Sequence, residues 1–181
     1  DQIYPGANDW SHANSIWRNN TEILLSLRFQ NSVLSLNGDL ESSDFGEVNW
    51  ILGGSGSDLD SDFQWSDQGV FEGQHDAQRI EGGISLFDNN SSNQSRGLLL
   101  DLDTSTMQVS ERESWSVGET CNDEGAVFLL ENGNALVTCA TASMIYEFSP
   151  GNNQEVWSSN ITCESGGPGG GPGGGSPGGM S

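Results

Sequence analysis

EILLSLRFQNSVLSLN, residues 22–37, contains two short apolar runs joined by a polar connection. A third run, EVNWIL (47–52), follows after Asn37-Gly38, and an Asn-Gly pair between apolar runs is a strong signal for a tight hairpin turn. Short apolar runs broken by Gly, Asn, Asp and Ser are typical of β-strands rather than of helices. This stretch therefore predicts consecutive antiparallel strands.

The same pattern recurs twice further along the chain, which identifies a repeat. The later runs are GISLFD (83–88), GLLLDLD (97–103) and QVSERESW (108–115), then NALVTC (134–139), MIYEFS (144–149) and EVWSS (155–159). One more strand candidate precedes each unit: HANSIW (12–17), HDAQRI (75–80) and GAVFLL (125–130). Four short antiparallel strands per unit, each unit ending near a Trp, are typical of a β-propeller blade.

We therefore predict an all-β fold with about three four-stranded propeller blades in residues 1–165. Trp50, Trp115 and Trp157 are expected to pack between blades, and at the open ends of an incomplete ring the apolar side chains around them are expected to be exposed. Propellers have about 4–8 blades, so three leave the ring incomplete, and we expect its open edges to self-associate or to pair with blades from another chain. The Gly- and Pro-rich stretch 166–181 predicts a flexible tail.

The chain is strongly acidic. Its 181 residues include 26 Asp and Glu but only 5 basic residues, all of them Arg, for a net charge of −21. Because binding to nucleic acids and anionic membrane surfaces depends on Lys and Arg that neutralise phosphate, neither partner is expected. The longest apolar runs, such as 23–25 and 98–100, are far shorter than the roughly 20 residues of a membrane helix. No membrane insertion is predicted.

The three cysteines, Cys121, Cys139 and Cys163, lack the spacing of a metal site, so we expect no metal there. In an oxidising compartment Cys121 and Cys139 are the favoured disulfide, because both flank one hairpin-sized stretch. Three reduced cysteines are the alternative. The acidic run 58–67 has oxygen ligands at alternate positions but lacks the EF-hand glycine and terminal glutamate, which favours a solvated loop over a calcium site.

Histidines and arginines supply the candidate functional residues. His12 and His75 each open the first strand of a unit, and the inner strands of a propeller line its channel, so we expect the two rings to share a site. The scarce guanidinium groups could hold an oxyanion through two parallel hydrogen bonds. Arg28 and Arg96 are the candidates for this role. The alternative to anion binding is that the arginines form ion pairs with Asp residues on neighbouring strands.

The chain resembles the bacterial-type arylsulfotransferase family in the order and the amino-acid sequence of its segments. These are DWSHANSI (9–16), EILLSLRFQNSVLSLN (22–37), GEVNWILGG (46–54), GQHDAQRI (73–80), ISLFDN (84–89) and SRG (95–97). Residues 125–157 match only as a generic blade. The resemblance implies a secreted or periplasmic six-bladed propeller. It would move a sulfuryl group from one phenolic ester to another phenol through a sulfated histidine, with no nucleotide donor and no cofactor.

By position, the resemblance makes His12 and His75 the catalytic residues that bind the sulfuryl oxygens and assist proton transfer, with Arg96 as the anion clamp. The family's nucleophilic histidine lies later in the chain, and no His follows His75 here. The chain is therefore a fragment lacking that blade, a member that lost catalysis, or one in which a remaining histidine took over. Binding of aryl sulfate esters and phenols is better supported than turnover. The alternative is a non-catalytic secreted propeller module for binding or scaffolding.

Overall fold

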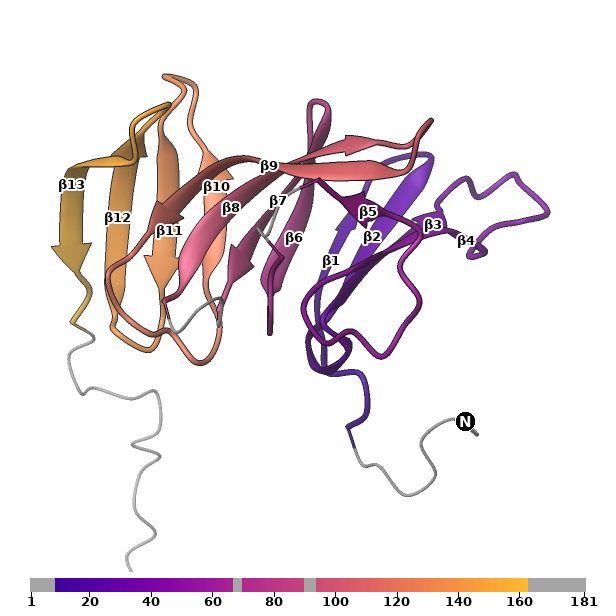
Figure 1. Cartoon of the computed structure of the whole chain (residues 1–181), viewed down its shortest axis with the longest axis horizontal. Coiled ribbons are helices and arrows are strands. Elements are labelled where there is room, and N and C mark those ends of the chain that lie inside the picture. Colours follow the sequence, from indigo (N-terminus) through magenta and orange to yellow (C-terminus); the bar gives the residue numbers. More distant parts are fainter. Residues whose placement is uncertain (1–8, 67–69, 90–93, 163–181) are drawn as a thin grey trace, which may run out of the picture.

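The computed structural model describes residues 9–66, 70–89 and 94–162. The predicted tail (166–181) and Cys163 lie outside the described residues. The described part is all-β apart from one 3-10 turn, η1 (Arg28–Gln30), and none of its helices could span a membrane. It forms three sheets that lie side by side in chain order, with the first and third at opposite ends and no closed ring (Figure 1). The all-β prediction is confirmed.

The first sheet has the strand order β1-β2-β3-β4, and every neighbouring pair is antiparallel. Its strands match the predicted runs to within one residue at each end: β1 (Ala13–Arg18), β2 (Glu22–Leu27), β3 (Ser32–Asn37) and β4 (Val48–Gly53). The tight turn predicted at Asn37-Gly38 is wrong, because residues 38–47 separate β3 from β4. Gly38 instead allows a close backbone approach, since a Cβ there would lie 2.7 Å from the backbone nitrogen of Glu22.

The second sheet has one more strand than predicted. Its order is β5-β9-β8-β7-β6, formed by β5 (Gln64–Trp65), β6 (His75–Ile80), β7 (Gly83–Asp88), β8 (Arg96–Asp103) and β9 (Gln108–Ser116). The short β5 pairs in parallel with the outer strand β9. Two residues show no alternation that a sequence pattern could reveal, and their pairing covers an otherwise open sheet edge.

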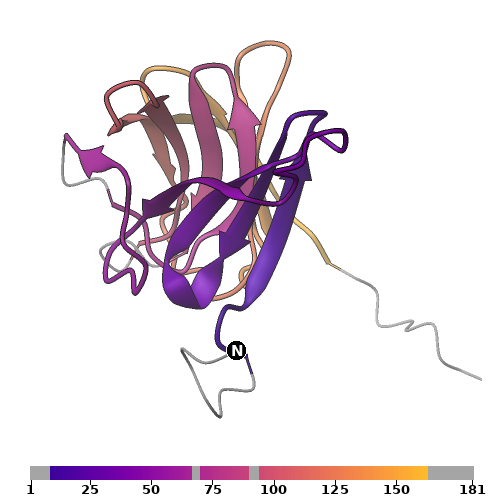
Figure 2. The ribbon, with the colours of Figure 1, turned by 90° about the vertical axis from the view of Figure 1, so that its right-hand side faces the viewer.

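The third sheet repeats the antiparallel arrangement of the first, with the order β10-β11-β12-β13. Its strands are β10 (Ala126–Leu129), β11 (Ala135–Cys139), β12 (Met144–Ser149) and β13 (Gln154–Asn160). Viewed from the end of the first sheet, the three sheets stand one behind another (Figure 2). One edge strand of each sheet lies beside that of the next, because β6 contacts both β1 and β10.

Two apolar cores fill the spaces between the sheets. One joins the first and second sheets and contains Trp50, while the other joins the second and third and contains Trp115. Both tryptophans are buried, so their predicted packing between units is confirmed. Trp157 is 49% exposed, so it does not pack between sheets and instead shows the exposure expected at an open end. It lies on the third sheet, where no described sheet follows to cover it.

Candidate functional site

A cavity of about 290 Å³ lies where connections from all three sheets meet, and we call it the loop-end cavity. Arg28 and Phe29 enter it from η1, and Asn31 caps that turn with a left-handed backbone, φ 45°. Residues 72–73 precede β6, while Asn89 follows β7. The complete lining is Arg28, Phe29, Asn31, Glu72, Gly73, Asn89 and Asn122.

Hydrogen bonds between the connections fix this arrangement. The side-chain oxygen of Asn31 accepts a hydrogen bond from the backbone N–H of Gly73 at 2.8 Å. Nearby, the buried amide of Gln74 donates to the backbone carbonyl of Ser32 at 2.9 Å and to that of Leu27 at 3.2 Å. The first sheet therefore holds the segment that leads into β6 and its first residue, His75.

His75 is buried, with 8% of its surface exposed, and lies beside the cavity wall. Its Nδ1 is 2.7 Å from the side-chain oxygen of Asn89, a residue that lines the cavity. The amide nitrogen of Asn89 donates to two backbone carbonyls, those of Cys121 at 2.8 Å and Glu124 at 2.7 Å. These two acceptors fix the orientation of the Asn89 amide.

The fixed amide also decides the tautomer of the histidine. Because Asn89 can present only its oxygen to His75, the ring must donate from Nδ1. The neutral ring then carries its proton on Nδ1 and leaves Nε2 without hydrogen. Burial lowers the pKa of His75, and the nearby charges of Arg28 and His12 lower it further, against hydrogen bonds to Asn89 and Gly73 that raise it. His75 is therefore a neutral, oriented imidazole.

His12 lies just before β1, close enough to influence the charge state of His75. Its Nδ1 is 2.6 Å from a carboxylate oxygen of Asp9, and its ring packs against Phe29 with 4.6 Å between centroids. Its backbone is left-handed, φ 46°. In the second sheet the corresponding left-handed residue at the strand start is Asp76, φ 54°, so the two histidines do not hold matching positions.

Arg28 reaches from the first sheet to the connection before the third. It donates to the backbone carbonyl of Asn122 at 2.6 Å and pairs with Asp123 at 2.9 Å. The side chain of Asp123 is 68% exposed. Because its carboxylate partner is exposed, this ion pair contributes little free energy.

Arg96 occupies a different environment. Its guanidinium pairs with Asp88 at 3.0 Å and with Glu111 at 2.9 Å, and the Asp88 side chain is fully buried. Arg96 does not line the loop-end cavity. The structure thus brings His12, His75 and Arg28 together and places Arg96 in a buried ion-pair network. Its role as an anion clamp stays a prediction.

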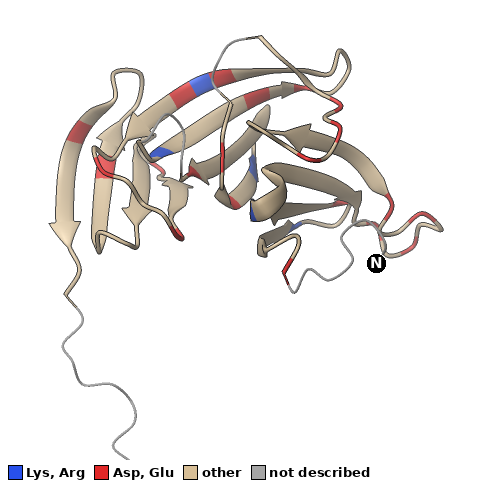
Figure 3. Cartoon of the chain, turned by 60° about the horizontal axis from the view of Figure 1, so that its bottom comes forward, with Lys and Arg blue, Asp and Glu red and all other residues tan. Residues whose placement is uncertain are grey.

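The alternative interpretation of the arginines was that they form ion pairs between strands. Such ion pairs are frequent in the described residues. Arg79 pairs with Glu22 across the first two sheets, and Arg112 pairs with Asp101. Acidic positions are spread over the strands and connections, whereas basic ones are few (Figure 3). Each ion-paired arginine therefore neutralises local carboxylates.

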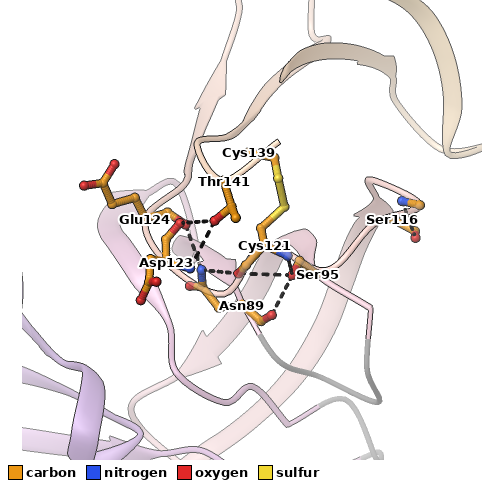
Figure 4. Close-up of a disulfide and its surroundings, with 9 residues drawn as sticks. Asn89, Ser95, Ser116, Cys121, Asp123, Glu124, Cys139 and Thr141 are labelled. Atoms are coloured by element: carbon orange, nitrogen blue, oxygen red, sulfur yellow. Dashed lines mark hydrogen bonds between the residues drawn. A yellow bond between two sulfur atoms is a disulfide. The ribbon is translucent and has the colours of Figure 1, made fainter. Parts of the chain in front are cut away.

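The predicted disulfide joins Cys121 to Cys139, and the backbone carbonyl of Cys121 is one of the two acceptors of Asn89 (Figure 4). The hydroxyl of Ser95 donates to the backbone carbonyl of Asn89 at 2.5 Å and accepts from the backbone N–H of Cys121 at 2.7 Å. A continuous set of contacts thus runs from the disulfide through Asn89 to His75.

Sequence reasoning missed Asn89, Phe29 and Asn122. An asparagine directly after a strand, at the same end as His75, is a signal that could have found the first. In the described ranges, no group of three His, Cys, Asp or Glu residues is arranged to hold a metal ion.

Comparisons with known proteins agree with this architecture. The sequence profile of the family described as arylsulfotransferase (ASST) matches residues 4–162. No curated protein gives a significant match.

Two solved structures resemble the fold. One is a Bacteroides fragilis protein assigned as a 6-phosphogluconolactonase (TM-score 0.51, 11% identity, 77% of this chain and 35% of that one). The other is Kuenenia stuttgartiensis hydrazine synthase (TM-score 0.51, 13% identity, 87% of this chain and 38% of that one). The chain therefore spans little more than a third of either, and at these identities the likeness concerns the fold alone.

Proposed function

Because the chain belongs to the arylsulfotransferase (ASST) family, we propose that the loop-end cavity binds the sulfuryl group of aryl sulfate esters. The observation that carries the proposal is the position of Arg28, which lines the cavity with an exposed carboxylate partner, near the neutral imidazole of His75. A guanidinium offers parallel N–H donors to the oxygens of an oxyanion.

The cavity suits a small aromatic ester. Its volume of about 290 Å³ is just below the range of ligand pockets for drug-sized molecules, about 300–1,000 Å³. The Phe29 ring is half exposed and offers a face against which an aromatic ring can pack. Glu72 and the nearby Asp123 add negative charge. This favours a sulfate monoester, with one negative charge, over a phosphate monoester that carries nearly two at neutral pH.

His75 meets two requirements for a group that assists sulfuryl chemistry. It is neutral, and Asn89 orients it so that Nε2 can accept a proton or a hydrogen bond. The third requirement is a nucleophile, and the histidine that the family resemblance assigns to that role is not in the chain. We therefore expect ester binding with little or no transfer to a phenol.

The three sheets would act as consecutive blades of an incomplete β-propeller, with β1, β6 and β10 as the inner strands. Their adjacency and the apolar cores between the sheets support this arrangement. The disulfide supports a secreted or periplasmic location, because disulfides persist in oxidising compartments.

A second candidate function is a non-catalytic secreted module for binding or scaffolding. The exposed apolar side chains of the two end sheets favour it, Ile16 on β1 and Trp157 on β13 among them. This function predicts protein contacts but no affinity for aryl sulfates.

Equilibrium dialysis with 4-nitrophenyl sulfate tests the proposal on wild type, Arg28→Met and the control Arg112→Met. We expect saturable binding to wild type and to the control, and at least about tenfold weaker binding to Arg28→Met, as for one lost charge-assisted contact. Binding of 4-nitrophenyl phosphate should be weaker in all three. Equal affinity in Arg28→Met would contradict the proposal. Transfer to a phenol that disappears in His75→Ala would overturn the expected lack of turnover and make His75 the nucleophile.

A further inference from the structure

The first sheet has an apolar face that no described sheet covers. Leu24 and Val33 point into the core shared with the second sheet, so the alternating side chains of β2 and β3 lie on the opposite face. Directly paired residues form an aliphatic row across this face, and Ile16 in that row is 73% exposed. We call it the leading face; its row is Ile16, Leu25, Leu34 and Ile51.

The third sheet has a corresponding uncovered face at the other end of the molecule. Val137 and Tyr146 point into the core shared with the second sheet, which places the residues that alternate with them on the outer face. Phe128 is 45% exposed and Trp157 49%. We call this the trailing face; its cross-strand row is Phe128, Leu136, Glu147 and Trp157.

The contacts between neighbouring sheets inside the chain show what packs against the equivalents of the trailing face. Trp50 and Trp115 lie on the corresponding faces of the first and second sheets, each in an apolar core shared with the next sheet. The core around Trp50 includes Ile84 of the second sheet, and the Arg79 guanidinium of that sheet lies 5.5 Å from the Trp50 ring centroid. The core around Trp115 includes Val137 of the third sheet. A trailing face thus packs against the largely aliphatic face of the next sheet. The leading face is an aliphatic sheet face of the same kind.

The two faces of one molecule lie at opposite ends and cannot meet each other (Figure 1). We propose that the trailing face of one copy of the chain docks on the leading face of a second copy, continuing the stack of sheets across the contact. The contact joins two different surfaces, so it closes into a ring or extends as a chain according to the rotation at each contact.

Charge placement agrees with this pairing. Arg18 is opposite Ile23 and therefore shares the leading face, where it is exposed. Glu147 lies within the row of the trailing face. Opposite charges on the two faces favour their contact, although the net charge of −21 opposes the approach of two copies. Because salt screens that repulsion, association should strengthen as the salt concentration rises.

Sedimentation velocity at about 1 M NaCl, where the Debye length is about 3 Å, tests the proposal. The samples are wild type, Ile16→Glu, Trp157→Glu and the control Phe45→Glu, which places the same charge on an exposed apolar residue of the β3–β4 connection. We expect wild type and the control to associate and each face variant to sediment as a monomer. An equimolar mixture of the two face variants should form dimers, because each retains the face that the other lacks.

Three results would overturn the proposal: a monomeric wild type, association unchanged in both face variants, or a mixture that stays monomeric. A monomeric wild type would mean that a second copy of the chain does not cover these faces. Circular dichroism verifies that each variant is folded, and the milder Ile16→Ser and Trp157→Ser replace any that is not.

Discussion

The side-chain oxygen of Asn89 accepts a hydrogen bond from Nδ1 of His75 at 2.7 Å, and the amide nitrogen of the same asparagine is held by two backbone carbonyls. One asparagine therefore sets the tautomer of the imidazole and ties it to the connection before β10. Because Asn89 accepts from Nδ1, the neutral His75 ring carries its proton on Nδ1 and has no hydrogen on Nε2.

Replacing Asn89 with Asp should raise the pKa of His75, because a carboxylate stabilises the protonated ring more than an amide oxygen does. NMR titration of the imidazole signals measures this directly, since the chain has only 2 histidines. Asn122→Asp is the matched control, because it adds the same charge at the cavity without a hydrogen bond to His75. An unchanged His75 titration in Asn89→Asp would contradict the assigned contact.

Burial of a neutral His75 makes stability depend on pH. Its pKa is lowered in the folded state, so below about pH 6.5 the unfolded chain binds a proton that the folded chain does not. The free energy of unfolding should therefore fall as the pH drops through this region. Urea unfolding of wild type and His75→Gln between about pH 7.5 and 5 isolates the effect. Wild type should lose more stability than the variant, and parallel curves would refute the linkage.

The two candidate arginines should differ in their effect on stability. Arg96→Met leaves the fully buried carboxylate of Asp88 without this partner and should cost about 3–5 kcal/mol. Arg28→Met removes an ion pair with the exposed Asp123 and should cost less than about 1 kcal/mol from that pair. Chemical denaturation measures both. If both variants lose the same free energy, the structural role assigned to Arg96 is wrong.

The disulfide should stabilise both the fold and the site. Cys121 and Cys139 are 18 residues apart, and closing a loop of that length contributes about 3 kcal/mol. A Cys121→Ala, Cys139→Ala double variant should lose this stability and broaden the His75 ring signal, because Cys121 also supplies an acceptor to Asn89. Thermal unfolding and NMR test the two effects separately. A sharp, unshifted His75 signal would mean that the disulfide does not position the ring.

Strand positions could be predicted from the sequence because alternation and turn residues are local. The prediction for β2 matches the structure at both ends, and the runs that became β7 and β12 match as well. The parallel strand β5 was missed, since Gln64 and Trp65 are too few to show a period. The exposure of Trp157 depends on which sheets are present, not on the strand itself, so it could be expected only from the incomplete number of blades.

The site was only partly predictable for a similar reason. His75 and Arg28 stood out as rare residue types in an acidic chain. Asn89 did not, because it begins the Asn- and Ser-rich stretch 89–93 and its importance comes from carbonyls more than 30 residues away. The ion pairs of Arg96 depend on strand register across β7, β8 and β9, which composition does not reveal.

The central claim, that an aryl sulfate ester binds in the loop-end cavity, is tested most directly by titrating 4-nitrophenyl sulfate while recording the ring signals of both histidines. The account predicts saturable shifts of the His75 and His12 signals that are absent with 4-nitrophenol and abolished in Arg28→Met. Histidine signals that stay unchanged at saturating ester, or that shift equally in Arg28→Met, would contradict it.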